Sequence, residues 1–108
     1  MSVSIDEFKK MEIKIGTVRS AVRVPETDKL LRLEVDFGEG SARQILSGIA
    51  GDIQPADIIG RQFPFLTNLE PRVIRGLVSN GMLLAVGEGD TFALLSPIRP
   101  VSPGSGIR

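Results

Sequence analysis

The sequence contains neither cysteine nor histidine among its 108 residues. Disulfides, thiol nucleophiles, imidazole acid–base catalysis and zinc sites built from cysteine and histidine are therefore excluded. The sequence also has no phosphate-binding glycine loop, no dinucleotide-binding fingerprint and no acidic metal triad. These absences predict a protein that is not an enzyme and that uses neither a cofactor nor a metal ion.

Aromatic residues are scarce, with no tryptophan, no tyrosine and five phenylalanines. Phe37, Phe63 and Phe65 fall in phase with apolar neighbours, and we expect them in the core. Proteins that bind single strands stack successive bases on exposed aromatic rings. This supply of residues therefore disfavours stacking of bases along a single strand.

No stretch approaches the roughly 20 consecutive apolar residues of a membrane span. The first ten residues carry acidic side chains where a signal peptide needs an apolar run. We therefore expect a soluble, cytoplasmic protein with no membrane partner.

The 13 basic and 13 acidic residues cancel, whereas nucleic-acid-binding domains usually have a basic surplus. Residues 41–80 differ slightly, because they hold four arginines against three acidic residues. A local positive face in this half would give modest, salt-sensitive binding, since phosphate neutralisation supplies most non-specific affinity.

The chain is long enough for one domain, residues 1–108, with a modest core. Ser4 and Glu7 have the spacing of a capping box and predict a short N-terminal helix. Its apolar edge, Phe8 and Met11, is too narrow for an isolated helix. The helix could plug one end of the domain or form a dimer contact.

Alternating apolar residues predict a small closed β-barrel of five strands. A change of phase next to Gly16 indicates a bulge in the first strand. Pro64 should face an unpaired edge or start a distortion, because proline donates no hydrogen bond to a ladder. The expected strands are Ile13–Val24, Leu31–Phe37, Ala42–Leu46, Gln62–Leu66 and Met82–Val86, with an additional short strand at Thr91–Leu95.

Two other segments connect or follow these strands. Ile49–Gly60 predicts a loop carrying a short helix between strands three and four. The tail Ser96–Arg108 is rich in proline and glycine but has apolar residues at intervals. We expect it to be ordered and extended, on the barrel or on a second subunit.

The stretch Asn68–Ala85 has a composition that a core element would not need, with two arginines, two glycines and Asn and Ser side chains among apolar residues. Pro71 disfavours a helix here, and Gly76 and Gly81 permit sharp turns or close backbone approach. This pattern predicts a rigid strand pair that presents a polar loop.

The same stretch resembles the signature of the tRNA-binding domain found at the C-terminus of many methionyl-tRNA synthetases, in free-standing structure-specific tRNA-binding proteins and in CsaA-like chaperones. Matching residues include Pro71-Arg72, Ile74-Arg75-Gly76 and Gly81–Ala85. The resemblance extends to Asp28–Leu33, Ser47–Ile49 and Pro103-Gly104. It implies an all-β fold, a five-stranded OB-fold barrel.

The resemblance also implies which residues contact RNA. Arg72 and Arg75 are the best phosphate ligands, because each guanidinium presents a fork of donors. An alternative is that these arginines pair with Glu70 or Glu88. Val73 departs from the family pattern, where this position is often basic. The full set of expected RNA-binding residues is Lys29, Ser47, Asn68, Arg72, Arg75, Ser79 and Met82.

Three functions are compatible with these residues and with the resemblance. The first is a non-catalytic tRNA-binding module, free-standing or accessory to a methionyl-tRNA synthetase catalytic subunit, that recognises folded tRNA by shape and backbone as a homodimer. The second is a CsaA-like chaperone or export factor that binds unfolded polypeptide. The third is a structural dimerisation module, for which Arg72 and Arg75 would have to be buried in salt bridges.

Overall fold

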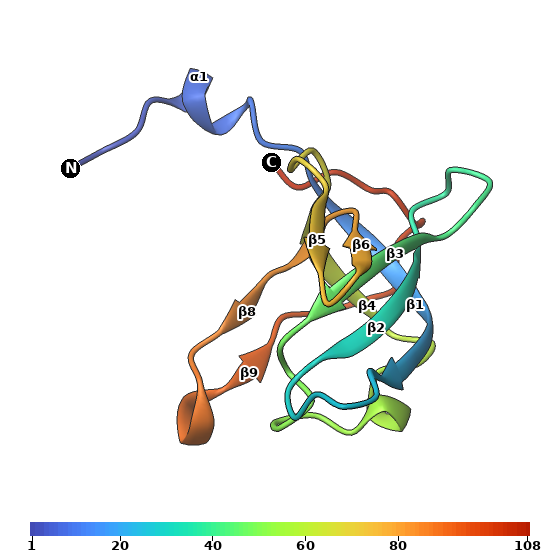
Figure 1. The fold of residues 1–108 in the computed structure, drawn as a ribbon. Coiled ribbons are helices and arrows are strands. Elements are labelled where there is room, and N and C mark those ends of the chain that lie inside the picture. The colour runs from blue at the N-terminus through green and yellow to red at the C-terminus, as the bar shows by residue number, and fades with distance from the viewer.

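The computed structural model describes all residues, 1–108, and is dominated by antiparallel strands. Five strands form one sheet in the order β3-β2-β1-β4-β7 that curls into a nearly closed barrel (Figure 1). The strands of this sheet are β1 (Ile13–Arg23), β2 (Leu31–Asp36), β3 (Arg43–Ser47), β4 (Gln62–Leu66) and β7 (Met82–Leu83).

No helix in the structure has the length and apolar character needed to cross a membrane.

The barrel is filled by the alternating side chains that the sequence predicts. In β2, Leu31, Leu33 and Val35 are fully buried, while Arg32 and Glu34 between them are exposed. Phe37, Phe63 and Phe65 are buried too, and the rings of Phe37 and Phe65 meet edge to face with centroids 5.3 Å apart. The predicted placement of these three phenylalanines in the core is confirmed.

The first strand is shared between two neighbours, as a closed barrel requires. Residues 13–17 of β1 pair with β4, and residues 17–23 pair with β2. The register shifts between Val18 and Ser20, so the irregularity expected beside Gly16 lies a few residues later. Between strands three and four, the loop carries the predicted short helix, a 3₁₀ turn η1 at Pro55–Asp57.

The predicted strand Met82–Val86 is instead divided into β7 and β8 (Ala85–Val86). Leu84 donates its backbone N–H to the carbonyl of Pro64, at 3.1 Å, but Pro64 has no N–H to return. The ladder between β4 and β7 therefore ends here, which confirms the distortion expected at Pro64. The chain then leaves the barrel as a hairpin of β8 and β9 (Ala93–Leu94), joined through the 3₁₀ turn η2 at Gly89–Thr91.

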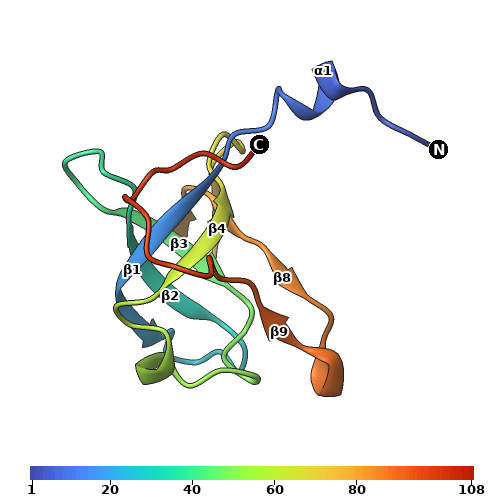
Figure 2. The same cartoon turned by 180° about the vertical axis from the view of Figure 1, so that it is seen from behind.

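The C-terminal tail is ordered on the barrel, as expected. It crosses β4 and then runs beside the first half of β1 (Figure 2), where β2 does not pair. Gly104 and Ile107 donate backbone hydrogen bonds to the carbonyls of Ile15 and Ile13, and Ile15 donates to Ser105. The tail therefore completes the pairing of β1.

The N-terminal helix α1 (Ile5–Phe8) begins with the predicted capping box, in which Ser4 and Glu7 exchange hydrogen bonds of 3.1 Å. It does not plug the barrel, so that interpretation is wrong. The helix projects away from the strands (Figure 1) and has no buried residue. With one turn and a narrow apolar edge, it offers too little surface to hold it against the barrel.

Candidate functional site

Strands β5 (Arg72–Ile74) and β6 (Leu77–Ser79) form a hairpin of their own beside the barrel. The turn between them consists of Arg75 and Gly76, with φ angles of 54° and 78°. Positive φ at both central residues gives a turn whose twist suits a two-residue hairpin, and Asn-Gly is its favoured sequence. The expected strand pair is confirmed, with Arg75 at its tip in a conformation that costs a non-glycine residue free energy.

Arg72, at the other end of the hairpin, lines a groove of about 850 Å³ between the barrel and the β8–β9 hairpin. Lys29, Ser47 and Met82 line the same groove. These residues come from the loop before β2, the end of β3, and the beginnings of β5 and β7. The fold therefore brings four of the seven predicted site residues to one concave surface.

Arg75 lines a smaller hollow of about 230 Å³ with the loop Thr27–Leu30. Lys29 belongs to both hollows, so it joins the tip of the hairpin to the larger groove. Five of the predicted residues thus form one continuous surface, which we call the hairpin groove: Lys29, Ser47, Arg72, Arg75 and Met82.

The cationic side chains of the hairpin groove are exposed and have no acidic partner. The ion pairs of the molecule lie elsewhere: Glu12–Lys14, Arg19–Asp36 and Glu39–Arg43. The alternative in which Arg72 and Arg75 pair with Glu70 or Glu88 is therefore not realised. Asp28, Asp52 and Glu88 also line the hairpin groove, which leaves its charge mixed.

Ser79 lies outside the hairpin groove, with 1% of its surface exposed. Its hydroxyl accepts a hydrogen bond of 3.0 Å from the backbone N–H of Leu46 and donates one of 3.1 Å to the carbonyl of Gly81. These bonds join β3 to the segment before β7, where the barrel closes. Because the hydroxyl is inaccessible and fully used, we do not include Ser79 in the proposed contact surface.

Gly81 also lies where the barrel closes, in the segment before β7. Its φ of 140° lies in a region open mainly to glycine, and a Cβ there would come within 3.0 Å of the Ile45 side chain and 3.3 Å of the Leu66 carbonyl. Ser79 and Gly81 of the signature therefore have a structural role that the sequence alone does not distinguish from ligand contact.

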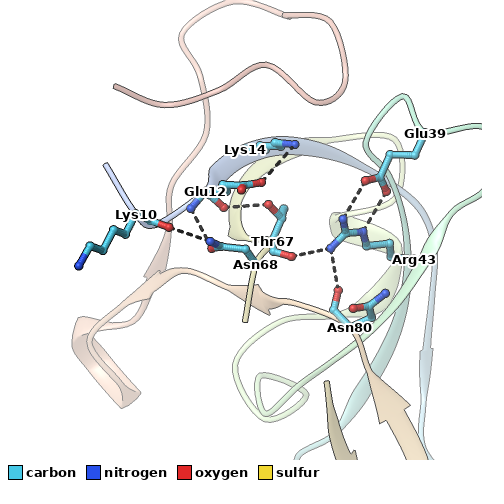
Figure 3. Close-up of polar contacts among 8 residues, drawn as sticks. All are labelled: Lys10, Glu12, Lys14, Glu39, Arg43, Thr67, Asn68 and Asn80. Atoms are coloured by element: carbon cyan, nitrogen blue, oxygen red, sulfur yellow. Dashed lines mark hydrogen bonds and ion pairs between the residues drawn. The ribbon is translucent and has the colours of Figure 1, made fainter. Parts of the chain in front are cut away.

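Asn68 is exposed, but its amide is used within the chain (Figure 3). The side-chain oxygen accepts a hydrogen bond of 2.9 Å from the backbone N–H of Glu12, and the side-chain nitrogen donates one of 2.7 Å to the carbonyl of Lys10. Asn68 thereby fixes the segment between α1 and β1. This role differs from the RNA contact implied by the resemblance.

Arg43 links the same region to the base of the hairpin (Figure 3). Its guanidinium donates to the carbonyls of Thr67 and Asn80, at 2.7 and 3.4 Å, and to both oxygens of Glu39. The hydrogen bond with Glu39 raises the pKa of Arg43, and the same bond lowers the pKa of Glu39. Arg43 therefore holds the chain on both sides of the hairpin and is not free for a ligand.

Phe92, just before β9, also lines the groove and is half-buried against the core. No periodic signal in the sequence points to it, because it stands between a glycine-rich turn and a two-residue strand. Phe92 supplies an aromatic ring to the groove, and the sequence analysis did not include it among the expected site residues.

Comparison with known proteins assigns the family. Residues 13–106 match the family described as "Putative tRNA binding domain". This match spans the barrel, the hairpin groove and the C-terminal tail. The chain belongs to this family.

Relatives in this family include much longer proteins. The methionine–tRNA ligase of Helicobacter pylori is 47% identical over 103 residues, which cover 95% of this chain but 16% of the ligase. The chain therefore spans about one sixth of the length of such relatives. The similarity concerns one part of a ligase.

Solved structures of similar length share the whole fold. A methionyl-tRNA-synthetase-related protein from Pyrococcus horikoshii is 35% identical with a TM-score of 0.92, covering 100% of this chain and 99% of its own. The chaperone CsaA from Bacillus anthracis is 30% identical with a TM-score of 0.88, and both chains are covered completely. The recognised family and the OB-like barrel are thus confirmed.

Proposed function

We propose that this domain binds folded tRNA through the hairpin groove and catalyses no reaction. The observation that carries the proposal is that Lys29, Arg72 and Arg75 lie on one continuous surface and form no ion pair. Guanidinium forks bind two phosphate oxygens together, and such contacts position a nucleic acid without reading its sequence. Recognition would then depend on the shape and backbone of the tRNA.

The direct test is a titration of labelled total tRNA by fluorescence anisotropy at two salt concentrations. Wild-type protein is compared with Arg72→Ala/Arg75→Asn, in which asparagine keeps the positive φ of the turn. Arg32→Ala/Arg108→Ala removes the same charge from exposed positions outside the groove. We expect the groove variant to bind about tenfold more weakly with a flatter salt dependence, and the control to bind as wild type does. Absence of binding at low salt would refute the proposal.

We further propose that the domain supplies tRNA affinity to a methionyl-tRNA synthetase, in the same chain or as an accessory subunit. Tethering a second tRNA-binding surface raises the effective concentration of tRNA at the catalytic site. The test is aminoacylation by a catalytic subunit with and without this domain. A lower KM for tRNA with unchanged kcat is expected, and an unchanged KM would count against the role.

A homodimer is part of this proposal, with the N-terminal arm, residues 1–12, as the contact. Val3, Ile5 and Met11 are large apolar residues that expose 71%, 65% and 46% of their surface. Two copies would present two hairpin grooves to one tRNA. Light scattering at micromolar concentration should give a dimer for wild type and a monomer for Val3→Ser/Ile5→Ser, whereas a monomeric wild type would refute the dimer.

Binding of unfolded polypeptide is the second candidate. The observations in its favour are the similarity to a CsaA chaperone and two exposed valines on the hairpin, Val73 and Val78. Suppression of the aggregation of an unfolded protein, lost in Val73→Ser/Val78→Ser but retained in the arginine variant, would support this function. Loss of tRNA binding alone in the arginine variant would favour the first.

A further inference from the structure

A basic cleft is lined by residues 96–100 of the tail, by residues 60–62 at the beginning of β4, and by Thr17 of β1. Figure 2 shows the tail crossing β4. The volume of the cleft is about 330 Å³. Two arginines line it: Arg61, which lies just before β4, and Arg99, which lies in the tail. It shares no residue with the hairpin groove and contains no acidic side chain. Neither arginine takes part in an ion pair.

The floor of the cleft is fixed by Gln62, whose side chain holds the tail against the barrel. The side-chain nitrogen donates a hydrogen bond of 2.7 Å to the carbonyl of Val101, and the side-chain oxygen accepts one of 2.9 Å from the backbone N–H of Val101. The same nitrogen donates to the hydroxyl of Thr17 at 3.1 Å. Pro97 and Pro100, whose φ angles are fixed by their rings, flank the segment that carries Arg99.

Arg61, Arg99 and Thr17 retain donors for a ligand, whereas both N–H groups of the Gln62 side chain are used within the chain. The guanidinium of Arg61 lies 5.7 Å from the ring centre of Phe63 and makes one backbone contact, with Asp57 at 3.5 Å. Thr17 is 7% exposed, and its hydroxyl accepts a hydrogen bond but donates none. Ile98 at the mouth is fully exposed, so nothing in the chain covers the cleft.

We propose that the cleft between Arg61 and Arg99 binds a phosphate group. Two unpaired guanidinium groups, an adjacent hydroxyl donor and the absence of acidic residues match the requirements of a doubly charged oxyanion. Planar guanidinium groups can bind two oxygens each, and a rigid wall lowers the entropy lost on binding. The phosphate is either a free anion or part of an RNA backbone that reaches this side of the barrel.

The experiment uses the full chain and two probes. Inorganic phosphate is titrated against ¹⁵N-labelled protein at constant ionic strength, with sodium chloride as the reference, and the amide signals of residues 96–101 are followed. In parallel, labelled tRNA is titrated by anisotropy. Both are repeated with Arg61→Ala/Arg99→Ala, with Arg61→Lys/Arg99→Lys, and with the control Arg32→Ala/Arg108→Ala. Overlaid spectra establish that each variant is folded.

If the site binds free phosphate, the amide signals should shift in a saturable way. The affinity for phosphate should fall at least tenfold in the alanine variant. It should fall less in the lysine variant, which keeps the charge but loses the planar fork. An RNA-backbone site predicts weaker tRNA binding in the alanine variant, with the salt slope reduced by about two. If neither probe distinguishes the alanine variant from the control, the proposal is overturned. Because the Arg72 and Arg75 variant leaves this cleft intact, failure of the hairpin groove to bind tRNA is a separate result.

Discussion

The barrel and the β5–β6 hairpin are both antiparallel sheets, yet they bury their side chains very differently. In the barrel, the apolar residues of β2 are completely buried, because the sheet closes on itself. In the hairpin, Val73 is 73% exposed and Val78 is 48% exposed. The hairpin is held to β3 by polar contacts, including the hydrogen bond from Gln44 to the carbonyl of Val78 at 2.9 Å. Burial is therefore concentrated in the barrel, whereas the hairpin leaves exposed the two arginines that we propose for ligand contact.

The largest expected effect lies in the barrel. Replacing Phe65 with alanine would remove a fully buried ring and its contact with Phe37. We expect a loss of about 3–5 kcal/mol in the free energy of unfolding, from lost burial and the cavity left behind. Urea denaturation measures it, with Val73→Ala on the hairpin as the control, expected to stay within about 0.5 kcal/mol. Equal losses at both positions would contradict the division between a stabilising barrel and an exposed hairpin.

The junction between the two regions should show an intermediate effect. Ser79→Ala leaves the N–H of Leu46 without a partner in a buried setting, at a cost of about 1–3 kcal/mol. Hydrogen exchange at the Leu46 amide should quicken beyond the change expected from global stability alone. Ser41→Ala, in an exposed turn, is the matched control and should have little effect. Unchanged exchange at Leu46 would argue against a closing role for Ser79.

The Glu39–Arg43 contact should make the hairpin's attachment sensitive to acid. Arg43 lowers the pKa of the Glu39 carboxyl from its ordinary value of 4.5, so the contact stabilises the fold at neutral pH. This contribution is present above that value and is lost as the pH falls through the lowered folded-state pKa. Because the pair is partly exposed, we expect less than about 1 kcal/mol.

Glu39→Gln tests this directly by thermal unfolding across the acid range. The variant should be less stable than wild type at neutral pH, and the two should converge as the pH falls below the folded-state pKa. The pKa of Asp36 is also lowered, chiefly by the N–H of Gly38 and then by Arg19, and this contribution remains in both proteins. A constant difference between the curves would contradict the assignment to Glu39.

The same contrast explains what could be predicted from the sequence. The strand Leu31–Asp36 was predicted to within one residue because burial on one face leaves a period of two. The strand Gln62–Leu66 is instead a short apolar run with three consecutive buried residues. The division of Met82–Val86 was not predicted, since it depends on Leu84 standing opposite Pro64, which only the strand register reveals. The sequence also could not decide whether α1 packs on the barrel or projects from it, because an apolar edge does not indicate its packing partner.

The candidate site could be predicted from the sequence only where a motif contains arginines that form no ion pair. Arg72 and Arg75 belong to a polar stretch that a core would not need, and they lie on an open surface. Ser79 and Asn68 belong to the same stretch, but their polar atoms are used within the chain. Residue type alone cannot separate a side chain that binds a ligand from one that closes the barrel, because both need hydrogen-bonding atoms.

The smallest expected change in stability is at the tip of the hairpin, where Arg75 has a φ of 54°. Asparagine tolerates this conformation better and forms the favoured Asn-Gly turn with Gly76. Arg75→Asn should therefore raise the free energy of unfolding by about 0.5 kcal/mol, or leave it unchanged, while it weakens tRNA binding. Arg75→Lys keeps the charge in the same strained turn and should retain more of the binding without the gain in stability. If asparagine weakened both stability and binding, the arginine would have a structural role in the hairpin, and the separation of stability from ligand contact would not hold there.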